Sequence, residues 1–245
     1  MFGLSGRTAI VTGGNSGIGR VMAAALREAG AAVVLVARNR ERLEATAAEL
    51  GAHAVSCDLS DRADLARAAD AAVRLAGEPD ILVNAAGINP RPHMNDLTEA
   101  VWDDVLEVNV TAPFLLGQRF GPGMAGRGWG RIINVVSQQA LRAYGNSGAY
   151  GVSKGGLASL TRSQAEAWSP HGVCCNAVAP GVVETPMTAA ILGDPAKAAA
   201  AAARTMIGRN GRPEDFAGIA VFLAGDGSAA ITGQVICVDG GFSAH

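Results

Sequence analysis

The chain has 245 residues, and 49% of them are hydrophobic, which is enough to build the core of one large α/β domain. Its 20 basic and 22 acidic residues give a formal net charge of −2, so the composition predicts no partnership with nucleic acid or an anionic membrane. No apolar run is long enough to span a bilayer, and the four cysteines lack metal-ligand or CxxC spacing. We therefore expect buried thiols, no metal site and a cytoplasmic protein.

Short apolar runs alternate with helix-like stretches along the whole chain. The expected strands are residues 8–12, 32–37, 53–57, 81–85, 131–137, 173–178 and 234–239. These runs are continuously apolar, as in strands that are buried on both faces, and the helical stretches 20–30, 40–51 and 61–77 each end in glycine. The pattern predicts one doubly wound Rossmann domain over 1–245, with a seven-stranded parallel sheet and helices on both faces.

The alanine-rich run at 195–205 is the only low-complexity segment. Alanine favours helix, but a run with so few large apolar groups would pack loosely. Two interpretations remain open, a mobile substrate flap at about 187–210 and an ordinary surface helix.

A glycine-rich turn, TGGNSGIG at 12–19, follows the first strand and leads directly into a helix. Glycine permits positive φ angles and close approach of the backbone to an anion, and the helix N-terminus adds free N–H donors. The turn therefore predicts a pyrophosphate cradle, formed by residues Gly13, Asn15, Ser16, Gly17, Ile18 and Gly19.

The sequence AYGVSKGG at 149–156 places Tyr150 and Lys154 four residues apart, which on a helix beginning near Ala149 puts them on one face. A phenol titrates near pH 10, and an adjacent cation lowers its pKa toward the range useful for proton transfer. Lysine can also release its own proton, which arginine does not. We expect Tyr150 to act as a general acid and base with a pKa lowered by Lys154.

The motifs TGxxxGIG and YxxxK, in this order and over nearly the whole chain, resemble those of the short-chain dehydrogenase/reductase family. The chain looks closest to the branch of gluconate 5-dehydrogenases and 3-oxoacyl-acyl-carrier-protein reductases. The resemblance implies hydride transfer between nicotinamide and a carbon that bears oxygen, in a homotetramer acting on a small-molecule substrate. It adds Asn109 and Ser137 to the catalytic set, with Ser137 orienting the substrate oxygen and Asn109 holding a water that links Lys154 to solvent.

The resemblance also assigns further cofactor contacts. Tyr150 and Lys154 would contact the nicotinamide ribose, and the remaining contacts fall on residues Asp58, Leu59, Asn84, Ala85, Gly87, Pro180, Gly181, Val183 and Thr185. Ala85 departs from the family pattern, which has a second asparagine there.

Cofactor choice depends on the end of the second strand, VLVARN, where Ala37 occupies the place of the usual acidic residue and Arg38 follows. A guanidinium can bind a 2′-phosphate with two hydrogen bonds, so we expect NADP(H) in preference to NAD(H). The alternatives are that Arg38 packs flat on the adenine or points to water.

The substrate pocket is expected to be walled by 88–96, 138–147 and 187–208. Arg91 could pair with a substrate carboxylate or be a solvated loop cation, and His93 is a weaker candidate for a second base. The expected polar wall suits a hydroxylated or acidic substrate, and it consists of Gln138, Gln139, Arg142, Tyr144 and Asn146. A non-catalytic NADP(H) regulator and a sugar-nucleotide epimerase stay as rival functions. The resemblance disfavours enoyl reduction, because that branch of the family separates the tyrosine and lysine more widely.

Overall fold

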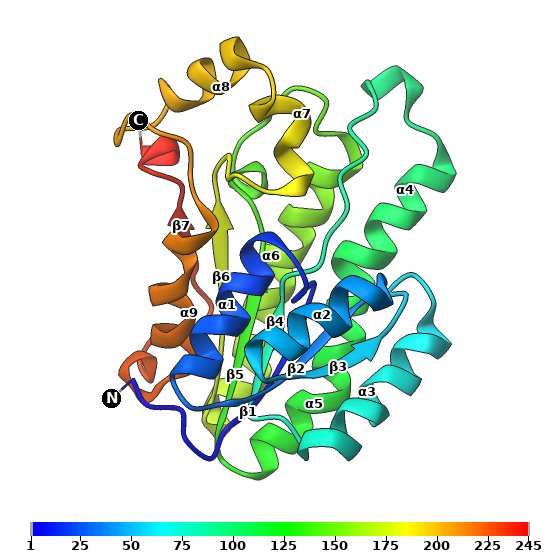
Figure 1. Ribbon diagram of the computed structural model, residues 1–245, viewed down its shortest axis with the longest axis vertical. Coiled ribbons are helices and arrows are strands. Elements are labelled where there is room, and N and C mark those ends of the chain that lie inside the picture. The colour runs from blue at the N-terminus through cyan, green and yellow to red at the C-terminus, as the bar shows by residue number, and fades with distance from the viewer. Residues whose placement is uncertain (1, 245) are drawn as a thin grey trace.

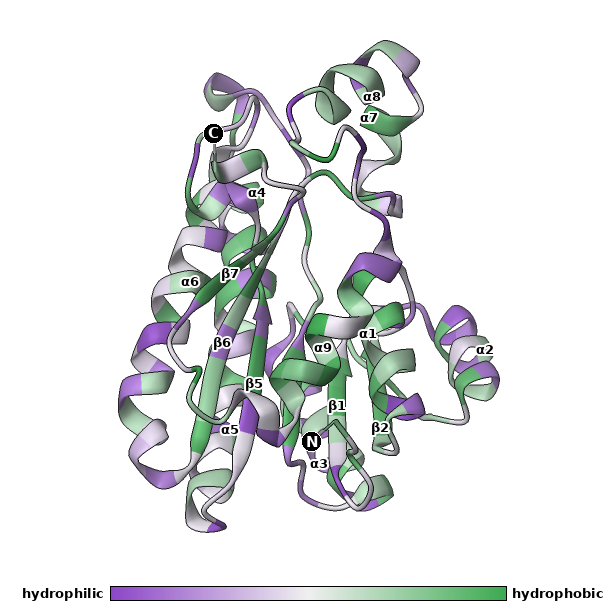
Figure 2. Ribbon diagram, turned by 90° about the vertical axis from the view of Figure 1, so that its left-hand side faces the viewer, coloured by the Kyte–Doolittle hydropathy of each residue, from purple (hydrophilic) through white to green (hydrophobic). Residues whose placement is uncertain are grey.

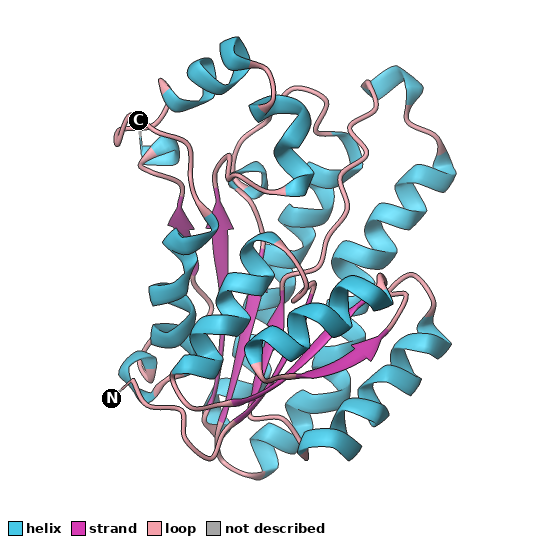
Figure 3. Cartoon of the chain, in the orientation of Figure 1, coloured by secondary structure: helices cyan, strands magenta, loops and turns pink. Residues whose placement is uncertain are grey.

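The computed structural model describes residues 2–244, and within them seven parallel strands form one sheet in the order β3-β2-β1-β4-β5-β6-β7. Figure 3 shows this sheet at the centre of the molecule, between layers of helix. The strands are β1 Thr8–Thr12, β2 Ala32–Ala37, β3 His53–Ser56, β4 Ile81–Asn84, β5 Gly130–Val135, β6 Val173–Pro180 and β7 Val235–Val238. The predicted fold class is confirmed, and each expected strand is present.

The helices cover both faces of the sheet because residues along each strand point alternately to either side. Alternate residues of β1 belong to two different cores: Ala9 and Val11 pack with α1 and α9, whereas Ile10 packs with α3 and α5. Figure 2 shows the hydrophobic strands between these layers. The helices are α1 Gly17–Glu28, α2 Arg40–Leu50, α3 Arg62–Ala76, α4 Glu99–Leu106, α5 Ala112–Gly126, α6 Gly148–Trp168, α7 Ala189–Leu192, α8 Pro195–Ala202 and α9 Ala217–Ala224.

A buried chain of side-chain amides ties α6 to the middle of the sheet. The Asn84 amide nitrogen of β4 donates to Asn134 Oδ1 of β5 over 2.8 Å. Asn134 Nδ2 donates in turn to Thr161 Oγ1 and Gln164 Oε1 on α6, over 2.9 and 3.1 Å. All four residues are buried, so these bonds fix the height and rotation of α6 on the sheet.

The chain changes direction across the sheet between β1 and β4, since β2 and β3 lie on one side and β5 to β7 on the other. Open α/β sheets bind ligands at this switch point, beyond the carboxyl ends of the strands. Two segments rise above that edge in Figure 1, the connection from β4 to α4 and the segment with α7 and α8. The role of the second segment as a substrate flap stays a prediction.

The cysteine prediction is only partly right. Cys57, Cys174 and Cys175 are buried and free, but Cys237 is free and exposed. Cys237 lies on β7, which pairs only with β6 in the described residues, so its outer edge lacks a neighbouring strand. No helix within residues 2–244 combines the length and hydrophobicity needed to cross a membrane.

The amide chain leads to a prediction about stability. Asn134→Ala should lower the free energy of unfolding by about 2–4 kcal/mol, because it leaves the Asn84 nitrogen and the Gln164 oxygen buried without partners. Urea unfolding measures the change, with Asn95→Ala on the exposed surface as a control expected within about 0.5 kcal/mol of wild type. Equal losses in the two variants would show that the amide chain does not stabilise the fold.

Candidate active site

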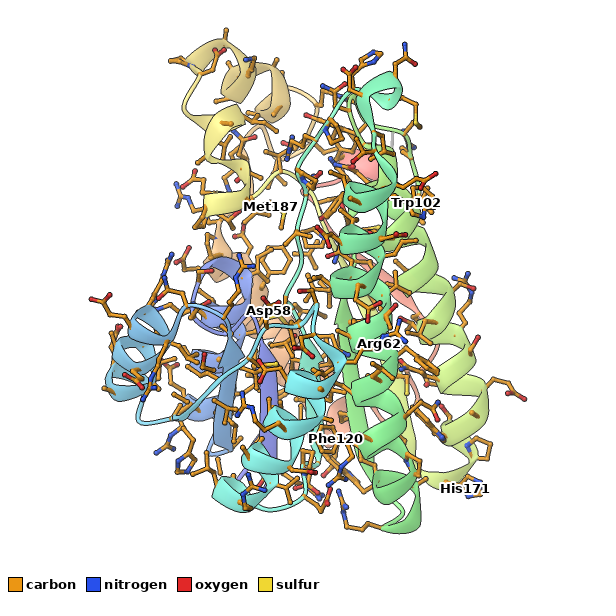
Figure 4. The ribbon with its side chains drawn as sticks, turned by 90° about the vertical axis from the view of Figure 1, so that its right-hand side faces the viewer. Asp58, Arg62, Trp102, Phe120, His171 and Met187 are labelled. Atoms are coloured by element: carbon orange, nitrogen blue, oxygen red, sulfur yellow. The ribbon has the colours of Figure 1, made fainter. Side chains whose placement is uncertain are left out.

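A cavity of about 840 Å³ opens at the carboxyl ends of the strands, at the switch point. Asp58 lies at its lower side and Met187 above it, at the base of the segment that carries α7 and α8 (Figure 4). The cavity is large enough for a dinucleotide and a small substrate to share it. Its lining brings together residues from the ends of β1, β2, β4, β5 and β6.

The glycine-rich turn forms one wall, and two of its glycines cannot be replaced by a larger residue without movement of the backbone. Gly13 has φ of +67°, and a Cβ there would lie 2.8 Å from Ala86 Cα. A Cβ on Gly19 would lie 2.5 Å from the carbonyl oxygen of Gly13. Ser16 is the N-cap of α1, but its side chain caps no backbone N–H. The first N–H groups of α1 thus stay available for an anion such as a pyrophosphate.

The far end of the cavity carries the predicted specificity residue Arg38. Its Nη1 lies 3.7 Å from Asp58 Oδ2, and its side chain is 80% exposed. Hydrogen bonds from Ser60 are the main cause that lowers the pKa of Asp58, and the Arg38 charge adds to the effect. Ala37 ends β2, so the position that usually carries an acidic residue has no carboxylate to repel a 2′-phosphate. The structure therefore offers one exposed guanidinium at this end, only loosely held by a single acidic partner.

Helix α6 begins at Gly148 and carries Tyr150 and Lys154 on the same buried face, where they are 8% and 3% exposed. Lys154 Nζ lies 5.6 Å from the centre of the Tyr150 ring and donates a 2.8 Å hydrogen bond to the carbonyl of Val135, the last residue of β5. Ser137 follows β5, is 6% exposed, and lines the cavity beside Tyr150. The predicted Ser–Tyr–Lys group is thus assembled in space.

The pKa shifts differ from the sequence expectation. Burial raises the pKa of the Tyr150 phenol, and the Ser137 hydroxyl and the Arg91 charge only partly offset this effect. Burial also lowers the pKa of Lys154 from 10.5 to about 8. The sequence prediction rested on the charge of Lys154 alone. In the structure both side chains are removed from water, and this favours the neutral form of each group. In this protein, Lys154 is the more acidic member of the pair.

Asn109 lies in a π-helical turn, Glu107–Thr111, between α4 and α5. Arg62 holds the start of the turn through two hydrogen bonds to the Glu107 carboxylate, of 2.7 and 2.8 Å, and its position is labelled in Figure 4. Asn109 Oδ1 accepts from the Ile88 N–H over 2.9 Å, and its Nδ2 donates to the Ile88 carbonyl and to Ser153 Oγ, each over 3.0 Å. Its first role is therefore to fix the backbone at Ile88.

Asn109 also lies close to Lys154. A Cβ built on Gly87 would lie 3.2 Å from Asn109 Oδ1 and 3.3 Å from Lys154 Nζ, so the two polar groups flank the same glycine. Asn109 is fully buried and outside the cavity lining.

Most predicted site residues line the cavity, and two do not. Asn109 lies behind the wall, and Asn84 is 1% exposed within β4, where its amide bonds Asn134. The lining includes the predicted residues Gly13, Asn15, Ser16, Gly17, Ile18, Gly19, Arg38, Asp58, Leu59, Ala85, Gly87, Ser137, Tyr150, Lys154, Pro180, Gly181, Val183 and Thr185.

The substrate side differs more from expectation. Gln138, Gln139 and Tyr144 line the cavity, whereas Arg142 and Asn146 lie outside its lining. The 187–208 wall is contributed by Met187, Thr188 and Ile191, and α8 lies farther out. Asn89 also lines the cavity, although the sequence analysis did not single it out. Its place shortly after β4, within the expected wall at 88–96, was the only feature of the sequence that could have indicated this.

Arg91 is one of two non-glycine residues with positive φ in the described chain, at +57°. It is half-buried, lines the cavity and lies near enough to Tyr150 for its charge to lower the pKa of the phenol. Positive φ in a residue with a side chain costs free energy and often marks a functional position. His93 is exposed, and its Nδ1 accepts from the backbone N–H of Asn95 outside the cavity lining.

Comparisons with known proteins agree with this geometry. A family model described as Enoyl-(Acyl carrier protein) reductase matches residues 13–243. The chain is 37% identical over 248 residues to a gluconate 5-dehydrogenase of Gluconobacter oxydans, covering 99% of this chain and 97% of that protein. It is 38% identical to a rhamnolipids biosynthesis 3-oxoacyl-[acyl-carrier-protein] reductase of Pseudomonas aeruginosa, covering 98% of each.

A solved structure shows the same fold with a ligand. The gluconate 5-dehydrogenase from Burkholderia cenocepacia in complex with NADP and tartrate has a TM-score of 0.94 and 34% identity, covering 100% of this chain and 98% of that one. These similarities extend over nearly the whole length of the relatives. The chain therefore belongs to the short-chain dehydrogenase/reductase family and is an oxidoreductase that acts on CH–OH groups.

Proposed function

We propose that the protein interconverts a secondary alcohol and a ketone with NADP(H), and that Tyr150 is the general acid and base. The observation that carries the proposal is that Tyr150, Ser137 and Lys154 share one cavity with an anion-binding glycine turn. The close spacing of Tyr150 and Lys154 on α6 supports alcohol and ketone chemistry over enoyl reduction. NAD(H) as cofactor, or binding without turnover, is the alternative.

The cavity residues fit a dinucleotide. The open N–H groups at the start of α1 would hold the pyrophosphate, and Arg38 would pair with the 2′-phosphate of NADP. Val183 and Thr185 also line the cavity, with the Thr185 side chain next to Gly17 of the glycine turn, and they would contact the nicotinamide carboxamide. When bound, NADP(H) supplies or accepts the hydride.

The chain's own residues then manage the proton. Ser137 would hydrogen-bond the substrate oxygen and hold it next to the Tyr150 hydroxyl. Burial keeps the Tyr150 phenol protonated near neutral pH, so it is ready to donate a proton in the reduction direction. In oxidation, the Tyr150 phenol would first release its own proton toward neutral Lys154, whose pKa is about 8, and would then take the proton of the substrate hydroxyl while the hydride leaves to NADP⁺.

Asn109 would complete this relay by binding a water. Both Nδ2 hydrogens are used by Ile88 and Ser153, and Oδ1 accepts only from Ile88. One acceptor lone pair of Oδ1 thus stays available beside Gly87 and Lys154.

The acidic substrate is the second part of the proposal. Arg91 is half-buried in the cavity wall beside Tyr150, which differs from the solvated loop cation that the sequence left open. We propose that it pairs with a substrate carboxylate, in line with the gluconate 5-dehydrogenases among the relatives.

Tyr150→Phe should lower kcat by about 10³-fold or more, because the variant keeps the ring but loses the proton that it transfers. Fluorescence titration should show that NADPH still binds. Tyr144→Phe, which changes the only other tyrosine, is the matched control and should cost less than tenfold. Near-normal turnover of Tyr150→Phe would refute the assignment.

Arg38→Asp should change the ratio of kcat/KM for NADP to that for NAD by about 10²-fold toward NAD, because a carboxylate repels the 2′-phosphate. The same charge change in Arg40→Asp is the control. Arg40 pairs with Glu44 outside the cavity and should leave the ratio nearly unaltered. A wild-type preference for NAD, or an unchanged ratio in Arg38→Asp, would contradict the cofactor assignment.

The pH dependence follows from Lys154. Because burial lowers its pKa to about 8, Lys154 is mostly protonated at pH 7 and mostly neutral at pH 9, where it can accept a proton. We expect kcat/KM for alcohol oxidation to rise through pH 8 and then level off. Lys154→Arg should lose this inflection because arginine stays protonated, and an identical profile in the variant would exclude Lys154 from the relay.

A further inference from the structure

Two side-chain amides in the cavity wall have hydrogen-bonding capacity that the protein does not use. Five buried side-chain N or O atoms lack a hydrogen-bond partner within residues 2–244, and two of them belong to residues that line the cavity. These two are Gln138 Oε1 and Asn89 Oδ1. A buried, unpaired amide oxygen is unfavourable, so its presence in a ligand site indicates that a ligand satisfies it.

Both amides are on backbone segments that neighbour residues of the site. Gln138 is 3% exposed. It directly follows Ser137, which would bind the substrate oxygen. Asn89 directly follows Ile88, whose N–H and carbonyl are both fixed by Asn109. The two residues therefore reach the same cavity from two different segments with well-defined backbones.

The neighbouring residue Gln139 differs from Gln138 because its amide oxygen has a hydrogen-bond partner. Gln139 also lines the cavity, but its Oε1 accepts a hydrogen bond from Ser147 Oγ. The Gln138 and Asn89 oxygens are held by no such bond, so either amide can turn without breaking a bond at its oxygen. Turning presents its acceptor to the cavity, where a hydroxyl can pair with it.

We propose that Gln138 and Asn89 are specificity-determining residues that bind hydroxyl groups on carbons beside the reacting one. The inference rests on the proposed function and narrows its substrate class. The pocket then selects polyhydroxylated substrates over 3-hydroxyacyl substrates, which have only methylene groups at those positions. A site whose polar groups need a hydroxyl rejects the analogue that lacks it, because the buried groups are left unpaired.

The test compares two six-carbon carboxylates, D-gluconate and 3-hydroxyhexanoate. They differ in the hydroxyls beside the reacting carbon and also in its distance from the carboxylate, so the change of their ratio in the variants carries the test. The wild type should show a kcat/KM for gluconate about 10²-fold or more above that for 3-hydroxyhexanoate. Gln138→Met and Asn89→Leu should each reduce this ratio by about tenfold or more, since each removes one hydroxyl partner. A wild type that prefers 3-hydroxyhexanoate, or a ratio that neither variant changes, would overturn the proposal.

Stability and a control variant separate specificity from a structural role. Replacing an unpaired buried amide with an apolar group removes a penalty, so the Tm of both variants should equal or exceed that of wild type. Asn210 has a similarly unpaired buried oxygen but lies outside the cavity lining, so Asn210→Leu should leave the substrate ratio unchanged. An equal loss of ratio in Asn210→Leu would count against the proposal.

Calorimetry distinguishes this inference from the proposed reaction. Gluconate and hexanoate are titrated into the NADPH-loaded protein, where no turnover is needed. Gluconate should bind at least about tenfold more weakly to Gln138→Met than to wild type, whereas hexanoate should bind both alike. If no alcohol is oxidised but gluconate still binds in this way, only the reaction is refuted. If gluconate binds wild type and variant alike, the hydroxyl-binding role is refuted.

Discussion

The site depends on one interaction, the hydrogen bond from Lys154 Nζ to the carbonyl of Val135 at the end of β5. Lys154 is buried, and burial is the only cause that shifts its pKa. A lysine in this position is held at a fixed place but is easily neutralised, which suits a group that passes a proton. It joins the helix that carries the phenol to the strand that leads into Ser137.

The elements around this bond are each fixed by separate contacts. The amide chain through Asn134 holds α6 on the sheet at Thr161 and Gln164, about two to three turns beyond Lys154. The Arg62–Glu107 pair holds the π-helical turn that presents Asn109, and Asn109 fixes the backbone of Ile88. Residues from distant parts of the chain thereby hold the cavity wall in place, while Arg38 has one weak acidic partner and the amide oxygens of Gln138 and Asn89 have none in the described residues.

The sequence was sufficient to predict the sheet, the glycine turn and the Tyr150–Lys154 face. These features depend on local periodicity and spacing, which a chain displays directly. The predicted direction of the pKa shift of Tyr150 was wrong, because this shift depends on how far the final packing removes the phenol from water. The place of Asn84 inside the sheet, and the absence of Arg142 and Asn146 from the cavity lining, depend on long-range packing that spacing does not encode.

The π-helical turn at Glu107–Thr111 gives the α4–α5 segment one residue more than regular winding would need. Each residue turns an α-helix by about 100°, so this extra residue sets the face of α4 out of phase with that of α5. Removing one residue here would restore unbroken winding and would rotate the amide of Asn109 away from Ile88. The length of this segment is thus as strictly constrained as the identity of the asparagine within it.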